Sequence, residues 1–107
     1  SKGVYDMAMT VTGISITPAS VKLNKNTIFS FSATVSGTSD LSLFGEANIV
    51  DQSVKYEIVP VVGTVKSQLD WRGVLFVPLD ETATTFNVKV TSTHNENVSA
   101  ISKVTVV

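Results

Sequence analysis

The sequence predicts an all-β protein folded as a two-sheet sandwich of about seven or eight antiparallel strands. Short segments rich in Val, Ile, Thr and Phe alternate with polar residues, and turn residues separate these segments at intervals of about 8–12 residues. No window of helical length carries an apolar stripe with a period of 3.6 residues. With 107 residues, 43% of them hydrophobic, the chain suits one domain with one core.

The first expected strand covers residues 11–23 and is interrupted twice. Val11 is out of phase with the apolar residues that follow Gly13, which predicts a bulge or kink at the glycine. Pro18 then splits the strand. Because proline removes a hydrogen-bond donor from the ladder, this segment is expected at a sheet edge.

The clearest strand follows a turn at residues 24–26. Its apolar side chains are Phe29, Phe31, Ala33 and Val35, and they alternate with Ser30, Ser32 and Thr34. Strict alternation places the first set on one face and the second set on the other. Residues 36–40 are small and polar and predict a turn, which opens a long loop up to residue 52 with at most a short strand in it.

The second half of the chain repeats the strand pattern. The expected strands cover residues 54–58, 61–65, 74–77, 86–91 and 99–107. Pro60 closes the first of these and Pro78 closes the third. Asp80 and Glu81 form a turn, and the polar residues 94–97 form the tip that leads into the last strand.

Composition excludes several classes of protein. The formal net charge is −1 and the eight Lys and Arg residues are scattered, so nucleic acid is not an expected partner. No apolar run approaches the roughly 20 residues that cross a bilayer, and residues 1–10 lack the apolar stretch of a signal peptide. The chain contains no cysteine, which excludes disulfides, thiolate metal sites and cysteine nucleophiles. No cofactor is expected.

Four motifs carry a family resemblance. They are V-T-G-I-S-I-T-P-A-S-V-K-L (residues 11–23), F-S-F-S-A-T-V (29–35), G-V-L-F-V-P-L-D-E-T-A-T-T-F-N-V-K-V-T-S-T (73–93) and S-K-V-T-V (102–106). In this order they resemble the bacterial immunoglobulin-like domain of group 2. The resemblance implies an immunoglobulin-like sandwich over residues 11–107, preceded by an extension or linker at residues 1–10. The second half is most similar to the copies carried by phage virion proteins.

The resemblance also implies a function without enzymatic activity. It indicates a structural protein or domain of a virion that decorates a phage capsid or tail, contacts capsid or tail proteins, and presents the module for surface adhesion or particle stabilisation. A host cell-surface carbohydrate or protein is a further expected partner. The first alternative is a stalk or binding module of an adhesin on the bacterial cell surface. The second is a carbohydrate-binding accessory domain, since outward Ser and Thr residues can donate hydrogen bonds to sugars.

Reactive side chains are few. His94 is the only histidine and lies in an expected hairpin tip, where a solvated loop residue is the preferred interpretation. Asp80 and Glu81 are adjacent, so in an extended chain they point to opposite faces and make a poor acid–base pair. Asp40, Asp51 and Asp80 could bind a hard cation only if folding gathers them, and no metal site is predicted.

The only tryptophan, Trp71, has two interpretations. Tyr56 stands where the resembling family often has a core tryptophan, so Trp71 could fill the core in its place. Alternatively, Trp71 and Arg72 form a surface contact, because these residue types are enriched at interface hot spots. Both interpretations are open at this point.

The N-terminal segment is unusually apolar for a solvated tail. Its apolar side chains include Val4, Tyr5, Met7 and Met9, whereas only two of its residues are charged. These four residues are candidates for docking on a partner. The segment could equally be a linker or an additional edge strand of the sandwich.

Overall fold

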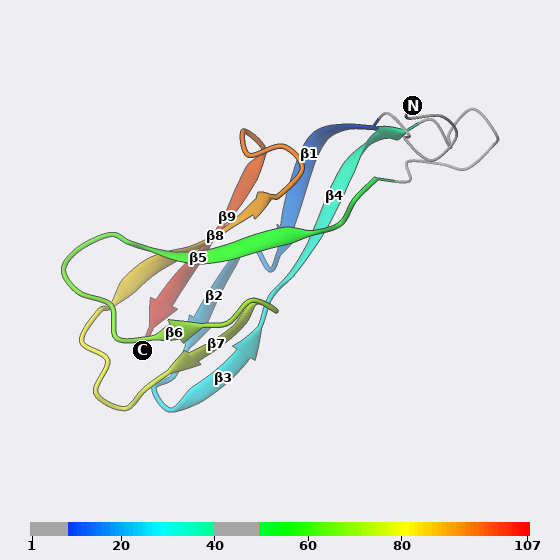
Figure 1. Ribbon diagram of the computed structural model, residues 1–107. Helices are drawn as coiled ribbons and strands as arrows, with labels where there is room; N and C mark the ends of the chain where they lie inside the picture. Colours follow the sequence, from blue (N-terminus) through cyan, green and yellow to red (C-terminus); the bar gives the residue numbers. More distant parts are fainter. Residues whose placement is uncertain (1–8, 40–49) are drawn as a thin grey trace.

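The computed structural model describes residues 9–39 and 50–107, and strands joined by turns and loops are the only regular secondary structure in this part of the chain (Figure 1). Its strands are β1 (Met9–Thr17), β2 (Ser20–Leu23), β3 (Thr27–Ser30), β4 (Ser32–Ser39), β5 (Val54–Pro60), β6 (Gln68–Leu69), β7 (Val74–Val77), β8 (Thr85–Ser92) and β9 (Ser99–Val106). The predicted β-sandwich is confirmed, with nine strands in the described residues instead of seven or eight. No described segment is a helix with the length and apolarity needed to span a membrane.

The strands form three hydrogen-bonded sheets, ordered β1-β4, β3-β7-β6 and β2-β9-β8-β5. Only Phe31 separates β3 from β4, and its N–H donates to the Gly73 carbonyl oxygen at 2.8 Å. The first two sheets are therefore two ladders of one layer. With β3 and β4 counted as one strand, and apart from the additional edge strand β2, the strand order of the two layers matches the four-stranded and three-stranded sheets of a constant-type immunoglobulin domain. The fold is immunoglobulin-like, and the expected two sheets become three because one layer is interrupted at Phe31.

At Pro18 the chain crosses from one layer of the sandwich to the other. Before it, β1 pairs antiparallel with β4; after it, β2 pairs parallel with β9. Both segments are edge strands, as the proline predicted, and the Thr17–Pro18 peptide bond is cis. The register of β1 shifts between Val11 and Gly13, which confirms the predicted bulge.

The turn predicted at residues 36–40 is wrong for its first four residues. Ser36 to Ser39 continue β4 and pair with β1 as far as Met9. Gly37 is needed for close approach and not for a turn, because a Cβ at this position would collide with the Thr10 carbonyl oxygen. In the sequence these residues are small and polar, which is typical of a turn. They form a strand because they pair with β1. Residues 40–49 of the expected loop lie outside the described residues.

The strand expected at residues 61–65 is also wrong. Gly63 has a φ of 71°, which an extended strand does not contain, and Val61 and Val62 are exposed. The short strand lies later, at β6, where it pairs with β7. The strand expected at residues 29–35 is divided into β3 and β4, yet its predicted faces hold: Phe31 and Val35 are buried.

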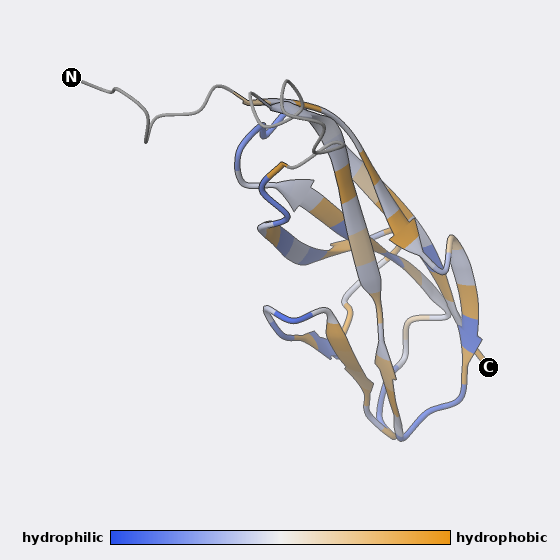
Figure 2. Ribbon diagram, turned by 90° about the vertical axis from the view of Figure 1, so that its right-hand side faces the viewer, coloured by the Kyte–Doolittle hydropathy of each residue, from blue (hydrophilic) through white to orange (hydrophobic). Residues whose placement is uncertain are grey.

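The main core lies between the two layers and is formed by buried apolar residues of both. Figure 2 shows apolar and polar residues interleaved along the strands. The fully buried members of the core are Leu75, Val77, Phe86, Val88, Val90 and Val104. Buried residues alternate with less buried ones along β8 and β9, as the strand pattern expected at residues 86–91 and 99–107 requires. A second cluster of Val11, Val35 and Val50 lies at the β1–β4 end.

Candidate functional site

The most exposed large side chain lies on the turn between β6 and β7, residues 70–73. The turn is held by the side chain of Asp70, whose Oδ1 accepts from the backbone N–H of Arg72 at 2.9 Å and of Val74 at 3.1 Å. Its Oδ2 accepts from Arg72 Nη2 at 2.8 Å and Nε at 3.1 Å. These hydrogen bonds, led by those from Arg72, lower the pKa of Asp70. Arg72 is therefore fixed along the turn.

Gly73 closes the same turn and is required there for two reasons. Its φ of 85° lies in the left-handed region that disfavours a side chain. In addition, a Cβ on this residue would lie 2.7 Å from Tyr56 Cζ. The aromatic ring of Tyr56 thus packs directly on the backbone of the turn and fixes it against β5.

We expect Gly73→Ala to lower the free energy of unfolding by about 2 kcal/mol, because the alanine meets both the unfavourable φ and the Tyr56 ring. Urea denaturation measures the change. Gly13→Ala is the matched control, since a Cβ on Gly13 would have no atom within 4 Å, and its effect should stay within about 0.5 kcal/mol. Equal losses for the two variants would contradict this account of the turn.

Trp71 points away from the fold at the tip of this turn. Its relative exposure is 82%, so the interpretation of Trp71 as a core residue is wrong. Half-buried Tyr56, which packs against the main core, occupies the interior instead. Trp71 and Arg72 border a groove of about 450 Å³, which is completed by Gln52, Ser53, Val54 and Tyr56. We refer to this feature as the Trp71 groove.

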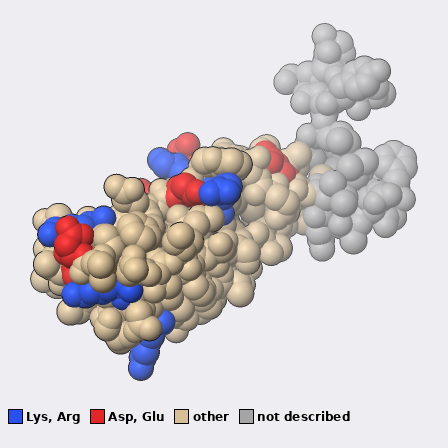
Figure 3. Space-filling model, turned by 90° about the horizontal axis from the view of Figure 1, so that it is seen from below, with Lys and Arg blue, Asp and Glu red and all other residues tan. Residues whose placement is uncertain are grey.

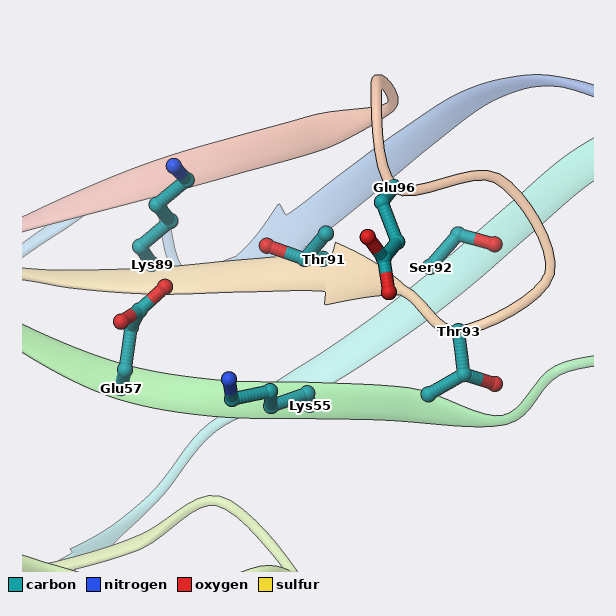
Figure 4. A pocket seen from close by; sticks show the side chains of 7 residues that line it. All are labelled: Lys55, Glu57, Lys89, Thr91, Ser92, Thr93 and Glu96. Atoms are coloured by element: carbon teal, nitrogen blue, oxygen red, sulfur yellow. The ribbon is translucent and has the colours of Figure 1, made fainter.

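A second, more polar groove of about 260 Å³ lies on the outer face of β5 and β8 (Figure 4). Its lining residues are Lys55, Glu57, Lys89, Thr91, Ser92, Thr93 and Glu96. Two lysines and two glutamates balance each other, and Glu57 is directly opposite Lys89 in the β5–β8 ladder. On the face in Figure 3, charges of both signs likewise form small mixed groups on a mostly uncharged surface.

Glu81 is the one buried carboxylate in the described part of the chain, and the sequence interpretation missed it. Its relative exposure is 1%. Oε1 accepts from Ser67 Oγ at 2.6 Å and Ser67 N at 2.8 Å, and Oε2 accepts from Thr82 N at 2.9 Å and Ala83 N at 3.1 Å. The Lys66 N–H also donates to it. Burial opposes ionisation, but these hydrogen bonds outweigh it and lower the pKa to about 2.

Through these hydrogen bonds Glu81 links the segment before β6 to the segment before β8, and its role is therefore structural. No sequence signal distinguished it from its neighbour Asp80. Asp80 is exposed and lies 3.7 Å from Lys66 Nζ. Which of the two carboxylates is buried depends on a contact across 14 residues, and local pattern does not encode that contact.

The remaining candidate residues are not brought into one centre. His94 is exposed in the loop after β8, in agreement with the predicted loop histidine. Asp51 accepts from the Ser53 N–H at 2.9 Å, and hydrogen bonds from Ser53 lower its pKa. Asp80 instead neighbours Lys66, and Asp40 lies outside the described residues. Within residues 9–39 and 50–107, no group of three or more His, Asp or Glu side chains could hold a metal ion.

The docking residues predicted near the N-terminus divide into two sets. Val4, Tyr5 and Met7 lie outside the described residues. Met9 is the first residue of β1, is half-buried, and packs against the cluster around Val11. Its sulfur accepts from the Asp51 N–H at 3.5 Å. Met9 therefore belongs to the sandwich itself.

Comparison of the sequence with known protein families and with curated proteins finds no match.

Proposed function

We propose that this chain is a non-enzymatic structural protein or domain of a virion, which decorates a phage capsid or tail and presents an immunoglobulin-like module for adhesion or particle stabilisation. The resemblance of residues 73–93 to phage virion copies of the module motivates the virion assignment. Attachment by protein contact is supported by one observation, the exposure of Trp71 on a hydrogen-bonded turn.

The turn that carries Trp71 is suited to a contact role. Asp70 and Gly73 fix its backbone and Arg72 is held to Asp70, so little backbone freedom of the turn remains to be lost on binding. Exposed tryptophan beside arginine is the composition typical of interface hot spots. The adjoining Trp71 groove adds a concave apolar and polar surface that a side chain of a capsid or tail protein can enter.

We expect Trp71→Ala to weaken binding to phage particles that lack this protein by about 30-fold, the effect of removing one hot-spot side chain. Co-sedimentation of the purified full chain with such particles measures the change. Leu79→Ala is the matched control, because Leu79 is another exposed large apolar residue, at 71%, on a different loop. A third variant without residues 1–8 leaves β1 intact and tests the N-terminal residues separately.

Failure of the intact chain to bind any such particle would contradict the decoration role. Binding that is unchanged by Trp71→Ala but lost without residues 1–8 would retain decoration and place the contact at Val4, Tyr5 and Met7 instead. Binding of the isolated chain to a glycan array, with no binding to particles, would favour the carbohydrate-binding alternative.

A further inference from the structure

Strand β5 is an open edge of the four-stranded sheet β2-β9-β8-β5. Its only strand partner among the described residues is β8, and no described strand runs along its other side in Figure 1. Part of the space beside it is the Trp71 groove, which Val54 and Tyr56 border. Variable-type immunoglobulin domains carry additional strands at this side of the sheet.

The hydrogen-bond pattern identifies which backbone groups of β5 are free, that is, without a partner among residues 9–39 and 50–107. The Thr93 N–H donates to the Ser53 carbonyl oxygen at 3.1 Å, in register with the β5–β8 ladder. In a strand, N–H and C=O of one residue point to the same side and those of the next residue to the opposite side. The odd-numbered residues of β5 therefore bond to β8. The even-numbered residues, Val54, Tyr56 and Ile58, direct their N–H and C=O groups outward from the sheet edge.

Pro60 has the same parity, so its missing N–H would have faced outward. The proline ends the row of free donors after three residues and limits the length over which another strand can pair. The outward-facing edge therefore offers three residues with one donor and one acceptor each.

We propose that β5 pairs antiparallel with β5 of a second copy, related by a two-fold axis at Tyr56. In this register Tyr56 faces Tyr56 of the other copy and Val54 faces Ile58. All six free N–H and C=O groups of each edge then bond, because each facing pair of even-numbered residues exchanges two hydrogen bonds. The result is a continuous eight-stranded sheet with an isologous interface.

The charged side chains select this register. Lys55 and Glu57 are exposed on β5, and in the proposed pairing each Lys55 faces Glu57 of the other copy. Shifting the two-fold axis by one residue places Lys55 against Lys55 or Glu57 against Glu57, and like charges directly opposite destabilise a sheet. Lysine on an edge usually discourages pairing with other strands. Here Lys55 and Glu57 disfavour the shifted registers, whereas in the proposed register they are complementary to Glu57 and Lys55 of the second copy. This inference does not depend on the proposed virion role.

Sedimentation equilibrium of the full chain, from about 10 μM to about 1 mM, tests the pairing. The expected mass rises with concentration from 11.4 kDa toward twice that value. We expect Lys55→Glu and Glu57→Lys, tested singly, to weaken the dimer at least about tenfold, because each places like charges opposite in both cross-strand pairs. The double variant K55E/E57K restores opposite charges and should dimerise as the original chain does.

Lys22→Glu is the matched control, since it makes the same charge change on β2, the other edge of the sheet. It should leave dimerisation unchanged. Amide exchange of the unmodified chain requires no variant: the N–H groups of Val54, Tyr56 and Ile58 should become protected as concentration rises. A mass of 11.4 kDa at every concentration would overturn the proposal. Undiminished dimerisation of both single variants, or failure of the double variant to recover, would equally refute this register.

Discussion

Replacing Glu81 by glutamine is expected to lower the free energy of unfolding by about 3 kcal/mol at pH 7. The carboxylate accepts hydrogen bonds on both oxygens, whereas a glutamine amide has one oxygen and one NH2 group. That NH2 would face backbone donors in a site that is closed to water, leaving them without acceptors. The same hydrogen bonds lower the pKa from 4.5 to about 2, which corresponds to a stabilisation of about 3 kcal/mol. Chemical denaturation of both proteins measures the difference.

The same group predicts how stability depends on pH. Its pKa is lower in the folded protein, so the unfolded chain takes up the proton first as pH falls. The stabilisation is therefore complete above about pH 4.5 and is lost progressively as pH falls toward about 2. At pH 3 the advantage of the unmodified protein over Glu81→Gln should be smaller by about 2 kcal/mol.

Asp80→Asn is the control for both measurements. It makes the same chemical change in the adjacent residue, but Asp80 is exposed and only 3.7 Å from one lysine. Exposed ion pairs contribute little, so a change within about 0.5 kcal/mol is expected. If Glu81→Gln were as mild as Asp80→Asn, or if its effect were the same at pH 3 and pH 7, the structural role assigned to Glu81 would be wrong.

Phe86→Ala is expected to cost about 3–5 kcal/mol, the largest effect of any substitution considered for this chain. Phe86 has 0% exposure and is the largest of the fully buried side chains, at the centre of the main core. Its loss leaves a cavity between the two layers, because β8 is paired on both sides, with β5 and β9, and cannot readily move to fill the space. Thermal and urea unfolding measure the change.

Phe76→Ala is the matched control for Phe86→Ala. It removes the same side chain from another strand, where Phe76 is 39% exposed, and should cost about 1 kcal/mol. Since domains of this size are only marginally stable, Phe86→Leu provides a milder second variant, with an expected loss of about 1–2 kcal/mol. Similar losses for Phe86→Ala and Phe76→Ala would contradict the assignment of the core.

The predictions from sequence succeeded where a side-chain period of two carries the information. Alternation along β8 and β9 identified the buried faces, because successive residues of a strand must point to opposite sides. Pro18 and Gly13 marked the break and the bulge of the first strand for equally local reasons, a missing donor and a missing side chain.

Those predictions failed where the outcome depends on a distant partner. Ser36 to Ser39 form a strand only because β1 extends to Met9, and the exposure of Trp71 follows from the way Asp70 and Gly73 close their turn. The strand expected at residues 61–65 illustrates the converse, since apolar residues with strand propensity remain exposed in a loop when no partner lies beside them.

The sequence by itself thus determined the all-β class and the alternating faces of its clearest strands, because alternation and turn residues act over a few positions. Tertiary structure alone decided which side chains are available for function. It buried Glu81 while leaving Asp80 in solvent, turned Trp71 outward, and left one edge of β5 without a strand partner in the described residues. Each of these outcomes is set by contacts between segments far apart in the chain, which no local pattern records.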